Sequence, residues 1–561
     1  MLRLRAMRLS DGGAAHPEVG RPRRTRPTAI CTALVLTVAA VAGVAAGAEA
    51  RPADAGEGKR PNILVVMTDD MAATDLALMP KTRQLLAAKG TTFADAIDSF
   101  PLCCPARATF ITGQYAHNHG VAGNFYPYGW YGMKRRGNTL PAWLQDAGYR
   151  TALVGKWLNG YGARDAHGEV PKGFDIWRGL LDVSAYDYFN FVMNRDGELR
   201  SWGDADFARG LVEFANIEVI GGVQTVTQVF ARLEEVFGPR PYTYWGAENP
   251  DDYSPDVTGK ITERLVRRER RSKRPFFIWW APAAPHREDV SVTLMGRPGD
   301  DPRPAPRYEA RSKSYTLPKP PSFNVPDTTV ANMRDHAPKL NDSAVQQLQL
   351  DYEGRSGSLL AVDDHVKRLV SILRKTHQLD NTVIVFLSDN GWLQGQHAIP
   401  GDKYLPYNES LRVPFIVRGP GIPRDRTVHG QVSNIDFAPT LLSWAHARAG
   451  RTMDGVSLTP TIRDPAKRPR RTIEIEATAP LFMGDVPNNA WDRPWSGVRT
   501  DRWTYVRYKE AGDEQLFDRR ADPFELNNLA RDPAYASVKA DMAARLAKLA
   551  RCKGKTCNVP G

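Results

Sequence analysis

Three short, continuous apolar runs constrain the fold of this chain more than any other feature. They occupy residues 62–67, 275–280 and 382–387. Runs of this length are typical of strands that are buried on both faces, and such strands occur in parallel sheets covered by helices. Helix-like patterns stand between them, over residues 81–89, 139–147, 261–271 and 361–375. The alternation therefore predicts an α/β fold with a large mixed, mostly parallel sheet flanked by helices.

The C-terminal part of the chain has a different pattern. Further strands are expected over 150–154 and 413–417, but past about residue 445 the strand-like segments become shorter. Residues 496–508 alternate like a sheet segment, and residues 537–550 have the pattern of a terminal helix. Because 561 residues exceed what one core usually holds, we expect two domains. The larger would cover residues 61–445, and the smaller, of α+β type, residues 446–561.

The first 50 residues are predicted to be a targeting segment. Basic residues at 21–26 precede an apolar run over 29–47, and Ala48-Glu49-Ala50 closes the run with small residues. This order is typical of a cleavable secretory signal peptide, here residues 1–50. A run of this length would also span a bilayer, so a retained anchor is the alternative, and Arg23-Arg24 leaves twin-arginine export open. We expect a secreted or extracytoplasmic protein whose only membrane contact is the signal segment.

The charge of the chain indicates an anionic partner. The full chain carries a formal net charge of +12, and without residues 1–50, which hold seven arginines and three acidic residues, about +8. Positive potential concentrates anions at a protein surface, so an exported protein of this charge suits a sulfated glycan. Nucleic acid is the competing partner. Since the sequence contains no groove-reading motif, we expect no nucleic-acid binding.

The five cysteines fall into three groups. Cys31 lies in the signal segment. Cys552 and Cys557 stand five residues apart near the C-terminus of an exported chain, which predicts a small structural disulfide. Cys103 and Cys104 are adjacent, in the run Cys-Cys-Pro-Ala-Arg that ends at Arg107. A buried or metal-binding cysteine pair is one interpretation of this run, and the segments below favour another.

Acidic residues follow two of the predicted strands directly. Asp69 and Asp70 come after the first strand, and Asp389 and Asn390 after the strand over 382–387. Ligands of open α/β sheets gather beyond the carboxyl ends of strands. Three carboxylates and an amide oxygen suit Ca²⁺ or Mg²⁺ better than zinc. Each pair alone would also make a good turn, but the two together predict a cation site.

Together these motifs resemble those of the sulfatase family, the formylglycine-dependent group of the alkaline phosphatase superfamily. Cys-x-Pro-x-Arg from Cys103 resembles its signature, and Gly-Lys-Trp-Leu-Asn-Gly around Lys156 its second signature. Ala-Pro-His ending at His286 is similar to its histidine-bearing strand. The segments 388–391, 395–397 and Lys403 are similar to its metal and lysine segment, and residues 516–529 to its C-terminal ending. The resemblance covers residues 61 to about 532 and implies an alkaline phosphatase-like fold.

The resemblance implies a sulfuric ester hydrolase. In this family a formylglycine-generating enzyme oxidises the signature cysteine to formylglycine, and a hydroxyl of the hydrated aldehyde attacks the sulfur of a sulfate ester. By position, Cys103 would be the precursor of this nucleophile. The expected ion is Ca²⁺, with Mg²⁺ less suited. Its implied ligands are Asp69, Asp70, Asp389, Asn390 and the converted residue 103.

The family resemblance also implies roles for the other residues that match the family's motifs. Arg107 would orient the nucleophile. Lys156 and Lys403 would neutralise sulfate oxygens, and His286, with Lys403, would donate a proton to the leaving alcohol oxygen. Lys156, His286 and Lys403 would thereby also bind the substrate. Alone, Lys156 would be an ordinary strand-end lysine and His286 a loop histidine, so the prediction rests on the combination.

One departure from the family pattern bears on the substrate. Many arylsulfatases have a histidine where this chain has Leu158, a position suited to the elimination step. The N-acetylglucosamine-6-sulfatase and heparan endosulfatase branch also reads Gly-Lys-aromatic-Leu-Asn and carries a His-Asn-His type segment, here His117 to His119. The sequence is therefore most similar to that branch. It leaves the elimination base unassigned: His117 and His119 would either support the residues of the site or be candidate bases.

Several functions fit the sequence to different degrees. The leading hypothesis is a sulfatase that acts on sulfated sugars, of the 6-O-sulfated N-acetylglucosamine type. A formylglycine-dependent phosphonate or phosphodiester hydrolase is the second, and a non-catalytic protein that binds sulfated glycans is the third. Residues 204–250 and 297–327 resemble insertions that we expect beside the substrate cleft.

Overall fold

The computed structural model describes residues 60–124, 128–162, 167–182, 184–204, 249–288, 301–478, 493–509 and 512–561. All of these belong to one compact unit of the chain. The predicted signal peptide, most of the predicted insertion over 204–250 and the first residues of the one over 297–327 lie outside the described residues. In the described ranges no helix combines the length and apolar character needed to cross a membrane.

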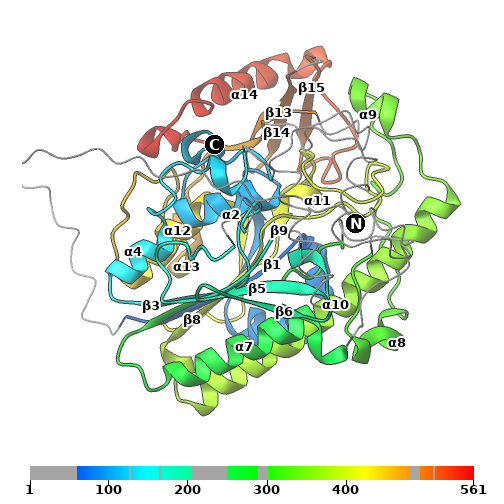
Figure 1. The fold of residues 1–561 in the computed structure, drawn as a ribbon. Coiled ribbons are helices and arrows are strands. Elements are labelled where there is room, and N and C mark those ends of the chain that lie inside the picture. The colour runs from blue at the N-terminus through cyan, green and yellow to red at the C-terminus, as the bar shows by residue number, and fades with distance from the viewer. Residues whose placement is uncertain are drawn as a thin grey trace, which may run out of the picture. The chain divides into compact units, whose positions relative to one another are not determined.

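An eleven-stranded mixed sheet forms the centre of this unit (Figure 1). Its strand order is β11-β2-β10-β8-β1-β7-β3-β4-β5-β6, and β9 pairs with β2. The strands are β1 (Asn62–Thr68), β2 (Thr91–Ile97), β3 (Arg150–Lys156), β4 (Ile176–Leu180), β5 (Phe191–Arg195), β6 (Glu198–Trp202), β7 (Phe276–Ala281), β8 (Thr382–Ser388), β9 (Arg412–Val413), β10 (Phe415–Arg418) and β11 (Arg426–Ser433).

The central strands β8, β1, β7, β3 and β4 are parallel. Every residue of β1, β7 and β8 is buried, as expected of strands covered on both faces. The prediction of strands from the three apolar runs is confirmed. Towards the edges β10, β5 and β6 run antiparallel to their neighbours, so the sheet is mixed with a parallel centre.

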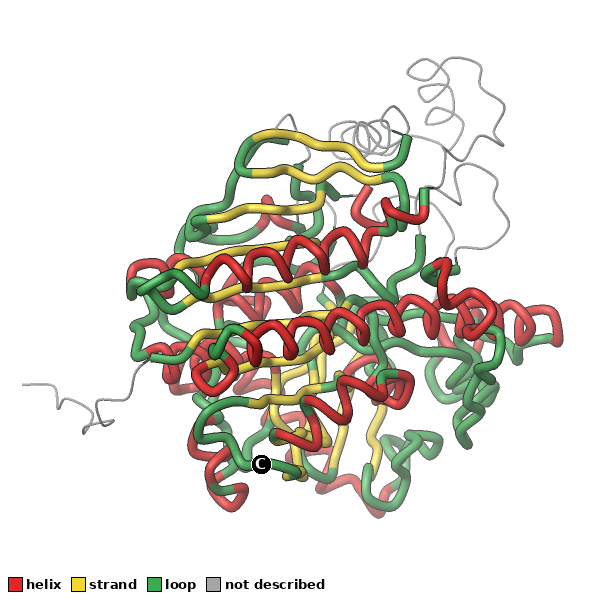
Figure 2. Tube along the Cα trace, turned by 90° about the horizontal axis from the view of Figure 1, so that it is seen from below, coloured by secondary structure: helices red, strands yellow, loops and turns green. Residues whose placement is uncertain are grey.

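Helices cover both faces of the sheet. They are α1 (Pro80–Leu85), α2 (Cys103–Thr112), α3 (Ala116–His119), α4 (Leu140–Asp146), α7 (Ser254–Glu269), α8 (Glu309–Ser312), α9 (Ala331–His336), α10 (Asp342–Lys375), α11 (Asn408–Leu411), α12 (Phe437–Ala445), α13 (Thr459–Arg463) and α14 (Ala536–Leu549). Side chains of α2, α4 and α12 share a core with one face of β1, and those of α7 and α10 share a core with the other. Figure 2 shows the two long helices lying along the sheet.

The helix α10 differs most from the prediction. It begins at Asp342, nineteen residues before the predicted start at 361, and the Asn341 side chain caps it by accepting a hydrogen bond from the Ala344 N–H. Gly354 and Gly357 obscure the helical pattern, since glycine disfavours helix interiors. Close packing explains why glycine stands at these positions. A β-carbon at Gly354 would lie 1.9 Å from the carbonyl oxygen of Pro302, so only glycine allows that segment to cross the helix.

Other predicted helices have shifted ends. The helix predicted over 81–89 is split at Leu86, where α1 ends and a short 3₁₀ turn over Ala87–Lys89 begins. The basic helix predicted from residue 261 already begins at Ser254, with Pro255 in its first turn. The terminal helix α14 agrees with the prediction to within one residue at each end.

A second, antiparallel sheet lies in the C-terminal part. It consists of β12 (Ile473–Ala477), β13 (Trp495–Arg499), β14 (Trp503–Tyr508) and β15 (Glu514–Asp518), with α14 packed on it. The predicted disulfide between Cys552 and Cys557 is present. The α+β character expected of this part is confirmed, whereas the boundary at residues 445 and 446 stays a prediction. This sheet shares its core with Tyr404 and Leu405, and thereby holds the loop next to Lys403.

Candidate active site

The two acidic strand ends meet, as the sequence predicts. Since β1 and β8 are parallel neighbours whose last residues, Thr68 and Ser388, are paired, the residues that follow them emerge side by side. The backbone N–H of Asp70 donates to Asp389 Oδ1 at 3.1 Å, and Asn390 Nδ2 donates to Asp70 Oδ1 at 2.7 Å. Asp70 has a left-handed backbone with φ of 58°, which turns the chain at this point.

Cys103 lies next to the carboxylates of Asp69 and Asp70, at the first position of α2. Its Sγ atom is 3.6 Å from Asp69 Oδ1 and 3.8 Å from Asp70 Oδ1. Burial raises the pKa of the Cys103 thiol, although Lys156 and Lys403 act in the opposite direction. Cys104 is also buried and free, and its Sγ faces the carbonyl oxygen of Asn159 at 3.7 Å.

Three cationic side chains surround the carboxylates. Lys156, at the end of β3, lies 2.6 Å from Asp69 Oδ2. Lys403 lies 2.6 Å from Asp70 Oδ1 and 2.8 Å from the sulfur of Cys103. Burial alone would raise the pKa values of both aspartates, but the lysine next to each holds its pKa below the ordinary value. The carboxylates are therefore ionised, and both lysines stay charged because these carboxylates raise their pKa values against the effect of burial.

Arg107, the third cation, connects the helix of the cysteine to the strand ends. Its Nε donates to Asp389 Oδ2 at 2.7 Å, and one terminal nitrogen donates to the carbonyl oxygen of Lys156 at 2.9 Å. The side chain is fully buried. A buried arginine with this bonding holds α2, and with it Cys103, in register with β3 and β8.

His286 completes the cluster from the loop after β7. Its Nδ1 lies 2.6 Å from the carbonyl oxygen of Arg287, and because a carbonyl only accepts, Nδ1 carries a proton. Its Nε2 is 3.3 Å from Lys403 Nζ and 3.4 Å from Asp70 Oδ2. Nε2 therefore points to the same space as the sulfur of Cys103, where a proton can be exchanged with a bound group.

Unpaired oxygen atoms indicate where a cation would bind. Asp70 Oδ2 and Asn390 Oδ1 are buried without a hydrogen-bond partner, although buried polar atoms are almost always paired. They lie among the carboxylates of Asp69 and Asp389, so the donors of this site are oxygen atoms. An all-oxygen donor set with three carboxylates fits Ca²⁺, and Mg²⁺ less well. Asp69, Asp70, Cys103 and His286 also offer donor atoms within 4.8 Å of one another.

Three residues of this site did not stand out in the sequence. The ring of Tyr186 packs on His286, with 4.3 Å between ring centres, and lies 4.6 Å from Lys156 Nζ. Arg355 of α10 donates to the carbonyl oxygens of Asp70 and Pro285. The ring of Trp392 lies 5.7 Å from Lys403 Nζ. The sequence offers no signal for Tyr186 or Arg355. Trp392 directly follows the Asp-Asn-Gly turn, so its closeness in sequence to Asp389 could have indicated that it lies near the site.

The structure places His117 and His119 away from these contacts. His119 is fully buried, with Nε2 3.0 Å from Thr109 Oγ1 and Nδ1 accepting from the Val121 N–H. Burial lowers its pKa well below the ordinary value, so it is neutral. His117 is bonded to the carbonyl oxygen of Cys552. Through Thr109, His119 supports the helix that carries Cys103, and an elimination base at either position stays a prediction.

The second predicted insertion packs next to the lysine loop. Phe323 forms an isolated bridge with Gln396, and the N–H of His397 donates to the carbonyl oxygen of Ser322 at 2.8 Å. Residues 301–327 therefore support the segment that leads to Lys403. Whether they border a substrate cleft stays a prediction.

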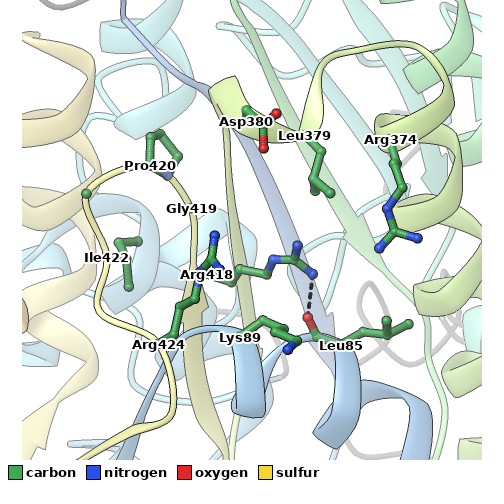
Figure 3. Close-up of a pocket in the computed structure, with 11 residues that line it drawn as sticks. Leu85, Lys89, Arg374, Leu379, Asp380, Arg418, Gly419, Pro420, Ile422 and Arg424 are labelled. Atoms are coloured by element: carbon green, nitrogen blue, oxygen red, sulfur yellow. Dashed lines mark hydrogen bonds between the residues drawn. The ribbon is translucent and has the colours of Figure 1, made fainter.

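A basic cavity of about 380 Å³ lies at the other end of the strands, where β8 begins (Figure 3). Arg418, at the end of β10, pairs with Ile384 near the start of β8, whereas Asp389 follows the end of β8. Burial, with Arg374 and Arg424, lowers the pKa of Arg418. Among the described residues, no cysteine or histidine lines this cavity.

The chain is similar to known protein families and sequences. The profile of the sulfatase family matches residues 61–447, and that of the C-terminal part of N-sulphoglucosamine sulphohydrolase matches residues 395–552. The chain is 31% identical to human N-acetylglucosamine-6-sulfatase, with 97% of this chain and 93% of the relative covered. It is 28% identical to an arylsulfatase of Chlamydomonas reinhardtii, with 94% and 79% covered.

Solved structures with the same fold were also found. One, of a protein in complex with its substrate D-glucosamine-2-N,6-O-disulfate, matches with a TM-score of 0.64 and 22% identity, covering 87% of this chain and 97% of that one. The phosphonate monoester hydrolase of Agrobacterium radiobacter matches with a TM-score of 0.62 and 21% identity, covering 88% and 95%. These likenesses show the fold, which is that expected from the sequence.

Proposed function

The chain belongs to the sulfatase family and is a sulfuric ester hydrolase, and from this premise we propose that it removes sulfate from sulfated sugars of the 6-O-sulfated N-acetylglucosamine type. The observation that carries the proposal is the convergence on Cys103. Its sulfur lies within 3.8 Å of Lys403 and of the carboxylates of Asp69 and Asp70. The human relative, named N-acetylglucosamine-6-sulfatase and similar over nearly its whole length, supports the choice of sugar.

The site would use two groups on which the sulfatase family depends, a Ca²⁺ ion and a formylglycine. Asp69, Asp70, Asp389 and Asn390 would hold a Ca²⁺ ion, since they supply its oxygen donors. When bound, the ion supplies positive charge that polarises the sulfate group. Residue 103, converted from cysteine to formylglycine, supplies a hydroxyl nucleophile in place of the thiol.

The other side chains act on charge and protons. Lys156 and Lys403 stand on two sides of Cys103, so a sulfate group there would meet two ammonium groups in a buried environment, where such charges act strongly. His286 Nε2, next to Lys403, would hand a proton to the alcohol oxygen as it leaves. Arg107 touches Asp389 and the backbone of Lys156, and would keep residue 103 oriented towards the sulfur atom.

The cellular setting follows from the N-terminus. We propose that residues 1–50 direct export and are cleaved, which makes the protein secreted or extracytoplasmic. A formylglycine-generating enzyme of the producing cell would be its partner in maturation. We also propose that the domains divide between residues 445 and 446. The smaller domain would support the loop of Lys403 through the hydrogen bond from Trp495 Nε1 to the Tyr404 carbonyl oxygen.

Substrate turnover tests the proposal. The secreted protein is assayed on N-acetylglucosamine-6-sulfate, on a phosphate diester and on a phosphonate monoester. The mass of the peptide that contains residue 103 is measured by mass spectrometry. We expect sulfate release, a lower peptide mass from conversion, and no release by C103A. Faster turnover of the phosphorus esters would favour the phosphonate or phosphodiester hydrolase. An unmodified Cys103 in every copy, with glycan binding but no turnover, would favour the non-catalytic protein.

A further inference from the structure

Two buried residues of α10, one helical turn apart, hold the loop that carries His286. Arg355 Nη1 donates to the carbonyl oxygen of Pro285, the residue before the histidine, at 3.2 Å. Asp351 Oδ1 accepts from Nε of Arg287, the residue after it, at 3.0 Å. Residues four apart on a helix lie on the same face, so α10 contacts the loop on both sides of His286. Asp351 and Arg355 are at most 1% exposed, and their contacts are therefore shielded from water.

The residue that Asp351 holds also determines where the ring of His286 points. The carbonyl oxygen of Arg287 accepts a hydrogen bond from His286 Nδ1 at 2.6 Å. With Nδ1 held there, Nε2 lies on the opposite side of the ring, 3.3 Å from Lys403 Nζ. Because Asp351 anchors the side chain of Arg287, it limits the movement of this carbonyl and thereby the rotation of the ring.

Arg355 connects the loop of His286 to the first acidic strand end. Its Nη2 donates to the carbonyl oxygen of Asp70 at 2.5 Å and to Asp75 Oδ2 at 3.1 Å. One guanidinium group thus contacts the backbone of Asp70 and the backbone next to His286, and Asp70 Oδ2 lies 3.4 Å from His286 Nε2. Since a guanidinium presents its donors in a rigid fork, Arg355 sets the spacing between the two loops. Lysine has a single nitrogen and could not donate in the same directions.

The ring of Trp392 closes the packing around these contacts. It lies 5.2 Å from the guanidinium carbon of Arg287, 5.5 Å from that of Arg355 and 5.7 Å from Lys403 Nζ. Three cations at this distance from one aromatic ring are attracted to it. The side chains that hold the histidine loop are therefore packed against the same ring as the lysine beside Cys103.

We propose that Asp351 and Arg355 are positioning residues for the release of the alcohol from the sulfate ester, and that they act through His286. When the bond between sulfur and the alcohol oxygen breaks, that oxygen keeps the electron pair and receives the proton of His286 Nε2. The sulfur takes its new bond from the hydroxyl at residue 103. A ring that is free to turn would less often have the geometry that proton transfer needs. The inference rests on the proposed role of His286, and assigns the orientation of this proton donor to α10.

A double-mutant cycle tests whether the two residues act through His286. The kcat on N-acetylglucosamine-6-sulfate is measured for D351A and R355K, each alone and combined with H286Q. Displacing a catalytic group by about 1 Å costs up to about 100-fold, so we expect each single change to lower kcat by about 10- to 100-fold. In the H286Q background the same changes should lower kcat by about twofold at most, because residues that act as a unit are not additive. Equal factors in both backgrounds would overturn the proposal.

Two control variants make the same types of change elsewhere. R471K alters a buried arginine that pairs with Asp436, and D363A removes a buried aspartate of α10 that bonds to α1. Both should lower the melting temperature, but kcat should stay within about twofold, and the factor should be the same with and without H286Q. Because D351A and R355K change opposite sides of the histidine loop, either one decides the question if the other does not fold.

Crystal structures of D351A and R355K give a readout without turnover. We expect the ring of His286 to leave its hydrogen bond with the Arg287 carbonyl oxygen in both variants. A ring in the wild-type position in both would overturn the positioning role, whatever the substrate is. Lack of turnover of the sugar ester by wild type would instead be a failure of the proposed function, and the crystal structures would still decide this inference.

Discussion

The ammonium nitrogen of Lys403 lies 2.8 Å from the sulfur of Cys103, although 300 residues separate the two in the chain. The same nitrogen is 2.6 Å from Asp70 Oδ1 and 3.3 Å from His286 Nε2. Lys403 therefore lies next to Cys103, to a carboxylate of the proposed cation site and to the proposed proton donor. Its loop is held by Tyr404, whose N–H donates to the carbonyl oxygen of Pro101 at 2.8 Å.

Replacing Lys403 by methionine is expected to lower kcat by about 10²- to 10³-fold, because a preorganised charge on the sulfate is lost. It also leaves the buried Asp70 carboxylate without its lysine, so the free energy of unfolding of the metal-free protein is expected to fall by about 3–5 kcal/mol. Sulfate release and thermal melting of K403M are compared with those of K313A, a change at an exposed lysine. Near-wild-type kcat in a folded K403M would contradict the role of this residue.

H286Q separates protonation of the leaving group from general binding. Loss of a proton donor lowers kcat by about 10²- to 10⁴-fold, but a leaving group that needs no proton is affected less. We expect a large loss on N-acetylglucosamine-6-sulfate and a much smaller one on 4-nitrophenyl sulfate, whose phenolate leaves readily. Equal losses on both esters would show that His286 positions the substrate and does not protonate it.

Chelation tests the cation site of Asp70 and Asn390. The charge of the proposed ion would supply several kcal/mol of transition-state stabilisation, so its removal is expected to lower kcat at least about 100-fold. Ca²⁺ added back should restore activity and raise the melting temperature, since an ion that binds only the native state stabilises it. Activity that survives in protein shown by mass spectrometry to hold no metal would exclude this role. N390A should need more Ca²⁺ for half-maximal activity.

Asp95 provides a pH-dependent link between β2 and the small sheet. It pairs with Arg499 at 3.0 Å and Arg519 at 2.8 Å. Burial alone would raise its pKa, but the two guanidinium groups lower the pKa to about 2. The folded pKa is thus depressed, so the stabilisation is present above about pH 4, the unfolded value, and is lost as the pH falls towards 2.

The variant D95N is expected to lower the free energy of unfolding by about 2–3 kcal/mol at pH 7, from a shift of about two pKa units. The difference from wild type should shrink between pH 4 and pH 2. Urea unfolding at several pH values measures it, with D342N, a change at an exposed aspartate, as the control. A difference that stays constant down to pH 2 would mean that packing, and not charge, is lost.

The strands and the meeting of the acidic strand ends were predictable because their signals are local. A strand buried on both faces needs a run of apolar residues, and a parallel sheet brings the ends of such runs to one edge. The order of the residues was therefore enough to place Asp69 and Asp389 together. Helix α10 could not be delimited, since Gly354 is explained only by the crossing of Pro302, a contact between segments 52 residues apart.

By itself, the sequence determined the chemistry of the chain: which residues carry charge, sulfur and protons, and the α/β order that brings the strand ends together. The tertiary structure alone decided which side chains meet. His286 stands in a loop and His117 in the short helix α3, yet one faces Cys103 and the other faces Glu474. The physical reason is that such contacts depend on how distant segments pack, and no local pattern encodes that packing. Tyr186 entered the site in the same way, through its contact with His286.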